Sequence, residues 1–165
     1  MTKDLRVDIM CLVWKMLLVS GILCGMFLFV FGLTGVGDRA MFPSIKDGDL
    51  VLFYRWDKAY AATDVVVIER NGEKQVCRVA AVAGDTVDIG EEGLLINGAL
   101  QQENGIYEKT YRYMEGIEFP ITLEENEIFV LGDARENSTD SRIYGPVKIS
   151  DTCGTVMAVL RHRGI

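Results

Sequence analysis

The sequence of 165 residues contains a single histidine, only three prolines and four cysteines, no two of which are spaced as a C-x-x-C pair. Zinc sites are built from clustered Cys and His ligands, so this composition argues against a metal site. The lone histidine, His162, stands among basic residues at the C-terminus, where a solvated tail residue is more common than a catalytic base. We therefore expect no metal and no cofactor.

Clusters of basic residues are also missing. The chain has 17 Lys and Arg against 24 Asp and Glu, a formal charge of −7. From residue 38 onward the balance is 14 against 22, or −8, because three basic and two acidic residues precede that point. Phosphate binding needs grouped Lys and Arg, which argues against nucleic acid as a partner. The acidic excess is typical of a solvated surface.

One long apolar run is present. Residues 16–37, MLLVSGILCGMFLFVFGLTGVG, carry no charge, and a helix of about 1.5 Å rise per residue would cross a hydrocarbon core of roughly 30 Å. This run predicts a transmembrane helix at 16–37, with a short cytoplasmic N-terminus at 1–15. A cleaved secretory signal is the alternative, although its apolar part is usually shorter. Three basic residues precede the run, so we expect the domain at 38–165 to be extracytoplasmic.

Beyond the apolar run, short segments rich in Val, Ile and aromatic residues alternate with turn signals, which predicts a single, mostly β domain. Asn71-Gly72 and Asn97-Gly98 are typical of hairpin turns. We find no helical periodicity, repeat or linker there. Whether Cys77 and Cys153 form a disulfide is left open. The expected strands are 50–54, 65–69, 74–82, 86–89, 94–96, 127–131 and 155–160.

Two segments are unusual for a generic β domain. The first is GDRAMFPSIKDGDL at 37–50, directly after the apolar run; the second is GDARENSTDSR at 132–142, directly after an expected strand. The second is dense in Asp, Arg and Ser, which can pair with one another and with the backbone. Taken alone, it could be an ordinary turn held by surface ion pairs.

Together these segments resemble the type I signal peptidases. The family's Ser-Met-x-Pro-Thr-like turn is matched by Ala40, Met41, Phe42, Pro43 and Ser44. A second box is matched by QVCRVAAVAGD at 75–85. The last box is matched by residues 132–142, with Ala134 in place of Asn, and is followed by YGPV at 144–147.

This resemblance implies a membrane-anchored, β-barrel-like domain that receives an extended signal peptide and cuts it with a Ser/Lys dyad. In that chemistry the Ser Oγ attacks the scissile carbonyl, and a desolvated Lys acts as the base. Backbone N–H groups at the nucleophile turn stabilise the oxyanion. A buried serine of the last box, here Ser138, holds the lysine in place.

Both dyad positions are changed in this chain. The nucleophile position is Ala40, whose methyl group cannot attack, and the base position is Cys77, whose thiol is not an equivalent base. Six charged and hydroxyl residues of the second and last boxes match, and we expect them to keep a structural role, with Arg78 paired to Asp133 or a neighbouring carboxylate. These motif residues are Arg78, Asp133, Arg135, Asp140, Ser141 and Arg142.

Two functions from different classes follow. In the first, the protein is a non-catalytic factor that binds an exported polypeptide, resembling degenerate family members associated with pilus assembly in Gram-positive bacteria; a pilin-like protein would be its partner. In the second, it is a working signal peptidase whose nucleophile has moved to Ser44 or Cys77. We expect a peptide to lie between the turn and the second box. The expected peptide-binding residues are Met41, Phe42, Pro43, Val76 and Val79.

Overall fold

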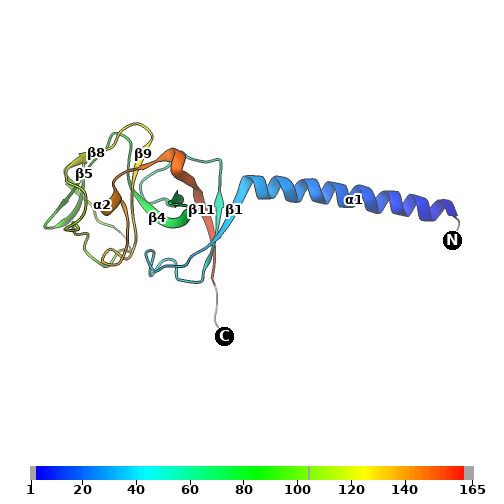
Figure 1. The fold of residues 1–165 in the computed structure, drawn as a ribbon, viewed down its shortest axis with the longest axis horizontal. Helices are drawn as coiled ribbons and strands as arrows, with labels where there is room; N and C mark the ends of the chain where they lie inside the picture. Colours follow the sequence, from blue (N-terminus) through cyan, green and yellow to red (C-terminus); the bar gives the residue numbers. More distant parts are fainter. Residues whose placement is uncertain (1–2, 104, 162–165) are drawn as a thin grey trace.

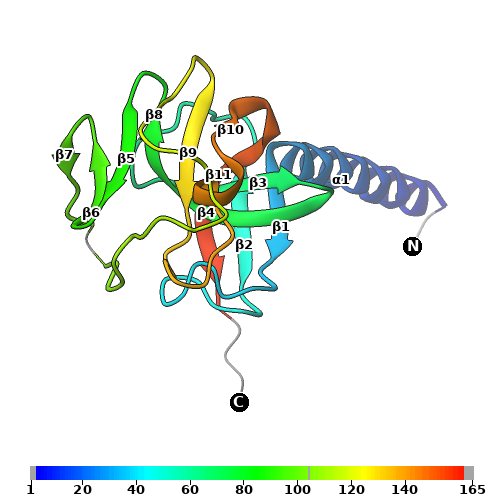
Figure 2. The same cartoon turned by 60° about the vertical axis from the view of Figure 1, so that its left-hand side comes forward.

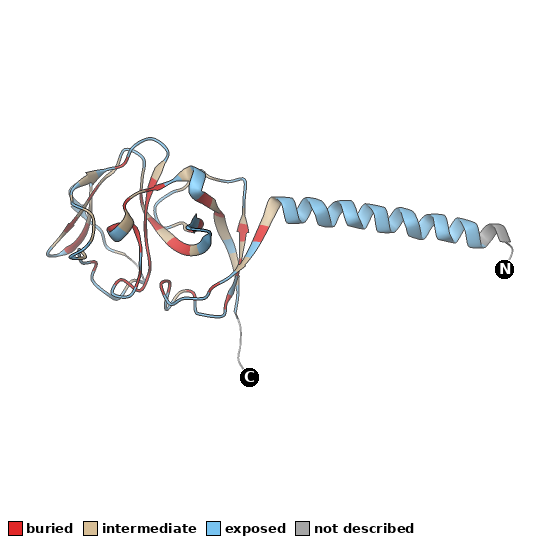
Figure 3. Cartoon of the chain, viewed as in Figure 1, coloured by how far each residue is buried: buried red, intermediate tan, exposed pale blue. Residues whose placement is uncertain are grey.

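A computed structural model describes residues 3–103 and 105–161 of the chain. A single long helix, α1 (Lys3–Val30), projects from one end of a β domain (Figure 1). The helix is exposed from Arg6 to Phe29, whereas the buried residues of the described chain lie in the β domain and at its junction with the helix (Figure 3). By length and composition, Arg6–Val30 is the one helix of the described chain apolar enough to cross a membrane.

The helix ends earlier than the uncharged run predicts. Residues 31–37 were expected to continue it, but β1 (Phe31–Gly35) pairs antiparallel with β2 (Leu50–Tyr54). A Cβ on Gly32 would lie 2.2 Å from the Phe53 ring, so glycine is needed for the ring to pack against the strand. Glycine also weakens a helix. Absence of charge could not distinguish this uncharged edge strand from a continued membrane helix.

The main sheet has seven strands in the order β1-β2-β11-β3-β4-β9-β10. Its neighbouring strands pair antiparallel throughout. The first and last strands, β1 and β10, do not pair with each other, so the barrel that we expected is not closed in the described chain. The strands not yet given bounds are β3 (Val65–Arg70), β4 (Glu73–Val82), β9 (Glu127–Leu131), β10 (Val147–Lys148) and β11 (Thr152–Leu160).

A second sheet of four strands, in the order β7-β6-β5-β8, lies on the side of the domain remote from α1 (Figure 1, Figure 2). It is joined to the main sheet by the turn between β4 and β5. The chain then passes through a long irregular segment before β8 and returns to the main sheet at β9. Its strands are β5 (Thr86–Gly90), β6 (Gly93–Ile96), β7 (Ala99–Leu100) and β8 (Ile121–Thr122).

All seven expected strands are confirmed to within a few residues at their ends. Both Asn-Gly pairs form two-residue turns with positive φ at each position, as type I′ hairpins require. The sequence did not predict β1, β8 and β10, whose partners are separated from them in the chain, or β7, a two-residue strand that pairs with β6 across the Asn97-Gly98 turn. It also missed α2 (Ser141–Tyr144) and the 3-10 turn η1 (Ile149–Asp151).

Buried side chains form three clusters. Alternate residues of β3 and β4 point to opposite faces of the main sheet, so Val67 and Val76 belong to the first cluster, and Val66 and Cys77 to the second. The third cluster fills the space between the main sheet and the second sheet, around Phe129. The two motif segments lie beside this core, which fixes their positions.

Candidate functional site

The nucleophile turn, residues 40–44, follows β1 and is held against the core by a buried methionine. Met41 is fully buried in the first cluster, and Ala40 is 6% exposed. The Ala40 N–H donates to Oδ1 of Asp38 at 3.0 Å, and the Ile45 N–H donates to the Met41 carbonyl at 2.8 Å. The turn therefore has a defined shape, although its central side chain is a methyl group.

The turn and the last box are in direct backbone contact. The Ala134 N–H donates to the Ala40 carbonyl at 2.9 Å. A Cβ on Gly132 would lie 2.6 Å from that carbonyl oxygen and 2.4 Å from the Ser138 Cβ. Glycine at 132 thus allows the two segments to meet. The structure brings both the Ala40 carbonyl and the Ser138 side chain close to this glycine.

Cys77 occupies the base position and is 1% exposed, in the second cluster. Burial raises the pKa of its thiol well above the ordinary range, and the negative charges of Asp140, Asp38 and Asp133 raise it further. The Tyr144 hydroxyl opposes part of this rise. A thiol in this environment stays neutral at physiological pH, so it is neither a base nor a thiolate nucleophile.

Tyr144, the hydrogen-bond partner of the Cys77 thiol, is itself contacted by two further polar side chains, Gln75 and Arg70. The Tyr144 hydroxyl donates to Gln75 Oε1 at 3.5 Å, and Gln75 Nε2 donates to the Thr139 carbonyl at 3.0 Å. The Arg70 guanidinium carbon lies 4.0 Å from the centre of the Tyr144 ring. This chain of contacts links β4 to the last box.

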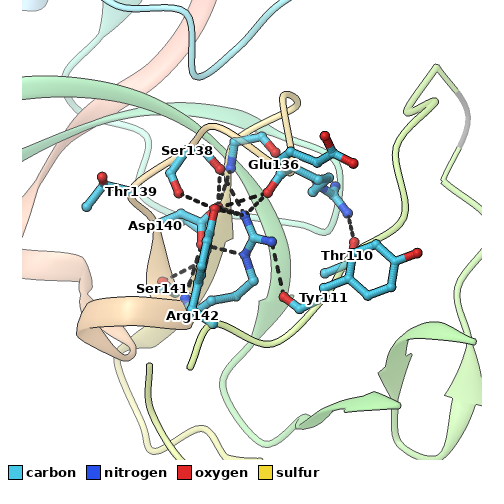
Figure 4. Close-up of polar contacts among 12 residues, drawn as sticks. Thr110, Tyr111, Glu136, Ser138, Thr139, Asp140, Ser141 and Arg142 are labelled. Atoms are coloured by element: carbon cyan, nitrogen blue, oxygen red, sulfur yellow. Dashed lines mark hydrogen bonds and ion pairs between the residues drawn. The ribbon is translucent and has the colours of Figure 1, made fainter. Parts of the chain in front are cut away.

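The last box is organised around one buried ion pair. Arg142 and Asp140 are almost fully buried, and the guanidinium binds the carboxylate through two bonds, Nε to Oδ1 at 2.8 Å and Nη2 to Oδ2 at 2.7 Å (Figure 4). Asp140 also accepts from the Gly132 N–H at 3.1 Å and caps α2 through the Arg142 N–H. Bidentate geometry with further donors is what makes a buried pair tolerable.

Ser138, at the position that the resemblance assigns to a lysine-positioning serine, is part of this network. Its Oγ donates to Asp140 Oδ2 at 2.5 Å and accepts from Arg142 Nη2 at 3.0 Å. Ser141 is likewise internal, since its Oγ accepts from the Val130 N–H at 3.0 Å. Both hydroxyls therefore hold the loop together.

Arg135 connects the last box to the segment before β8. It is 1% exposed, donates from Nε to the Gly132 carbonyl at 2.9 Å, and pairs with Glu103, whose Oε1 is 2.6 Å from Nη2. Its Nη1 also contacts Thr110 (Figure 4). The same segment supports Arg142, which lies 4.5 Å above the Tyr113 ring centre.

The predicted pair between Arg78 and Asp133 is confirmed. Arg78 donates to the Asp133 carboxylate twice, from Nε to Oδ1 at 2.7 Å and from Nη2 to Oδ2 at 2.6 Å. Its Nη1 also donates to the Thr63 carbonyl at 3.0 Å. The Asp133 side chain is fully buried and that of Arg78 is 24% exposed. The hydrogen bond to Asp133 raises the pKa of Arg78, so the pair joins the second and last boxes in its charged form.

Part of β4 has a free edge. The strand pairs with β3 from Glu73 to Arg78, but with β9 only from Arg78 onward. Residues 73–77 therefore have a strand partner on one side only, within the described chain. Odd-numbered residues bond toward β3, as shown by the Val79 N–H on the Asp64 carbonyl at 2.8 Å, so the backbone of Lys74 and Val76 faces the free edge.

A cavity of about 290 Å³ opens at this edge. Its lining comes from β4 and the adjoining hairpin turn, from the approach to the nucleophile turn and from the last box. The lining is polar, with both signs of charge. The lining residues are Asp38, Arg70, Asn71, Glu73, Lys74, Gln75 and Thr139.

The expected peptide-binding residues divide into two groups. The side chains of Met41, Val76 and Val79 are buried in the core and so cannot form open walls of a cleft, as we had expected. Phe42 and Pro43 are exposed. A peptide at this site would therefore meet the main chain of β4 and the exposed half of the turn.

Sequence reasoning missed the residues that brace the last box from a distance. Glu103, Thr110 and Tyr113 are 22 to 32 residues away from their partners and lie in no recognisable motif. Asp38 was also overlooked, although an Asp two residues before a turn amide is a known local acceptor. All four cysteines have free thiols, no candidate metal-binding cluster occurs in the described chain, and His162 lies outside it.

The mostly β domain, the N-terminal apolar helix and the two joined motif segments define a signal-peptidase-like protein. The family described as signal peptidase, peptidase S26, matches residues 9–161. The chain belongs to this family.

Relatives of known identity agree with this assignment. Signal peptidase I of Bacillus caldolyticus is 29% identical over 157 residues, which cover 87% of this chain and 86% of that protein. A probable thylakoidal processing peptidase 2 of Arabidopsis thaliana is 36% identical over 130 residues, although the match spans only 32% of its length. A crystal structure of a signal peptidase I from Enterococcus faecalis V583 aligns with a TM-score of 0.50, at 26% identity, over 69% of this chain and all of that one.

Proposed function

We propose that this protein is a membrane-anchored, non-catalytic member of the signal peptidase family that binds an exported polypeptide. One observation carries the proposal: the nucleophile position holds the methyl group of Ala40, and the base position holds the buried, neutral thiol of Cys77. Function depends on the site and not on the fold, so family membership alone does not imply cleavage.

The competing proposal is a signal peptidase with a relocated nucleophile. Cys77 would have to become a thiolate, which its burial and its acidic surroundings oppose. Ser44 lies four residues beyond the nucleophile position, after Pro43, and would attack from another part of the turn. A displacement of about 1 Å can cost a hundredfold in rate, so either relocation is unfavourable.

The binding mode that we propose is strand addition. The backbone of Lys74 and Val76 faces the free edge of β4, where an extended peptide could form main-chain hydrogen bonds without any nucleophile. The nearby cavity would accommodate alternate side chains of the peptide. Ala40 at the nucleophile turn would present a small apolar surface in place of a hydroxyl.

We also propose an arrangement in the membrane. The N-terminus would lie in the cytoplasm, the bilayer would be spanned within Arg6–Val30, and the β domain would face the extracytoplasmic side. Arg6–Val30 is long and apolar enough, and Lys3, Arg6 and Lys15 bias the N-terminus toward the cytoplasm. The partner would then be met at the membrane surface, as it leaves the cell.

The partner that we propose is a pilin-like surface polypeptide. Resemblance to the degenerate family members associated with pilus assembly favours this choice over an ordinary secretory precursor. Genes for sortases and pilins beside the coding gene would support an assembly role. Their absence from the neighbourhood would favour another exported polypeptide.

Cleavage is the first test. The full chain in detergent should not cut a signal-peptide substrate at a rate above that of a Ser44→Ala, Cys77→Ala double variant. A clear excess over the double variant would establish the relocated nucleophile instead.

Binding is the second test. Ala40→Arg should abolish capture of the partner in membranes and assembly of the surface polymer, because a bulky charge would block the turn. Lys46→Glu, at an exposed site of the same loop, serves as the control. Unchanged capture and assembly by folded Ala40→Arg protein would place the binding surface elsewhere.

A further inference from the structure

Asp38, two residues before the nucleophile position, places a carboxylate on the backbone N–H of Ala40. Acyl-transfer chemistry needs that N–H as a free hydrogen-bond donor. Asp38 is exposed, lines the cavity at the free edge of β4, and accepts the Ala40 N–H on Oδ1 at 3.0 Å. In acyl transfer, backbone N–H groups at the nucleophile turn stabilise the negative oxygen of the tetrahedral intermediate. Here that N–H already has an anionic partner within the chain.

We propose that Asp38 closes the oxyanion site and is a third obstacle to catalysis, separate from Ala40 and Cys77. It acts in two ways: its Oδ1 occupies the Ala40 N–H, and its charge would repel an oxyanion formed beside it. This inference rests on the proposed function, since it explains why the same site can hold a peptide and not cut it. A peptide carbonyl in the ground state needs no such donor.

The electrostatic surroundings support this assignment. The negative charge of Asp38 reaches Cys77, where it contributes to the raised pKa of the thiol. Asp133 and Asp140 have arginine partners, Arg78 and the buried Arg142, whereas Asp38 makes its contact with a backbone amide. Asp38 is therefore a carboxylate placed directly on the reacting side of the turn.

The reaction that tests the inference is hydrolysis by a chain with the dyad rebuilt through Ala40→Ser and Cys77→Lys. The introduced hydroxyl would bond to the scissile carbonyl carbon, the carbonyl π electrons would move to oxygen, and the hydroxyl proton would pass to the introduced amine. Collapse would then break the C–N bond, with the proton passing to the leaving nitrogen, and water would hydrolyse the ester. The oxyanion forms in the first step.

In this background we expect Asp38→Gly to raise kcat by about 10²- to 10³-fold with little change in KM, because a freed oxyanion donor acts only in the transition state. Asp38→Asn, which keeps the acceptor and removes the charge, should give a smaller gain. Asp57→Gly is the matched control, because Asp57 accepts the Ala59 N–H at 3.1 Å with the same spacing, away from the site. No gain from Asp38→Gly above this control would overturn the proposal.

A second measurement does not depend on turnover. In the unaltered full chain in micelles, the amide resonance of Ala40 should shift as the Asp38 carboxylate is protonated, and this response should vanish in Asp38→Gly while that of Ala59 persists. An Ala40 amide that ignores acidification would overturn the inference. Cleavage by the unaltered chain would instead overturn the proposed function, so the two failures are distinguishable.

Discussion

The last box meets the nucleophile turn at Gly132, yet the last box and the two dyad positions differ sharply in charge. On one side, Asp140 and Arg142 form a buried ion pair to which Ser138 contributes its hydroxyl. On the other side, Ala40 and Cys77 are small, neutral and buried. The charged groups of the last box, whose burial costs free energy, match the family motif, whereas the side chains at the two dyad positions do not. The comparison indicates that the last box holds the domain together whether or not it serves chemistry.

The largest effect is expected from breaking the buried pair. Asp140→Ala should lower the free energy of unfolding by about 3–5 kcal/mol, because it leaves the Arg142 guanidinium buried without its counter-charge. Denaturant unfolding in detergent measures the change. Asp88→Ala, which breaks the exposed pair with Arg112, should cost only about 0–1 kcal/mol. Equal losses in the two variants would contradict a structural role for the last box.

A smaller loss is expected where the pair is partly exposed. Asp133→Ala should cost about 1–3 kcal/mol, because Arg78 retains the Thr63 carbonyl and some contact with water. Thermal unfolding of the full chain measures the change. An unchanged melting temperature would show that the link between the second and last boxes has no structural importance.

The dyad side should respond to pH. The Cys77 pKa is raised on folding, so the neutral thiol stabilises the fold fully below the unfolded value of 9.0. Above it the unfolded chain loses the proton first, and stability falls by up to about 1.4 kcal/mol per pH unit. The free energy of unfolding of the unaltered chain minus that of Cys77→Ala, measured from pH 7 to pH 10, isolates the contribution of this residue. A difference that stays flat across that range would mean that the thiol is accessible and ionises in the folded protein.

The smallest effect is expected at Ser138. Ser138→Ala should cost about 1 kcal/mol and leave partner binding unchanged, because its Oγ serves only Asp140 and Arg142. Calorimetry and a capture assay would measure the two quantities. Weaker capture at unchanged stability would instead assign Ser138 to the binding surface.

Sequence patterns predicted those parts of the fold that depend on local chemistry. Short runs rich in Val, Ile and aromatic residues located the strands, and Asn-Gly pairs located both hairpin turns. The retained residue types of the two boxes predicted that Arg78 pairs with Asp133 or a neighbouring carboxylate, and the pair with Asp133 forms. In each case neighbouring residues or a recognisable motif carry the structural information.

Features that depend on distant partners were not predictable. The end of α1 depends on the packing of Phe53 against Gly32, and the open sheet depends on how β1 and β10 are placed. The bracing of Arg135 by Glu103 joins segments 32 residues apart. Burial of the expected wall residues Met41 and Val76 likewise follows from tertiary packing. Local sequence patterns do not indicate which residues far apart in the chain come into contact.

The junction between α1 and β1 has a mechanical consequence. The strand begins at the residue after the helix ends, and the Val30 and Phe31 carbonyls accept from the backbone and the Nε of Arg55 at 3.0 and 3.1 Å. The Phe29 and Trp56 rings add a contact with centres 5.4 Å apart. A hinge needs free dihedral angles, and this junction has few. A rotation of the helix would therefore be transmitted to the sheet, and the helix and the β domain would move together as one rigid body.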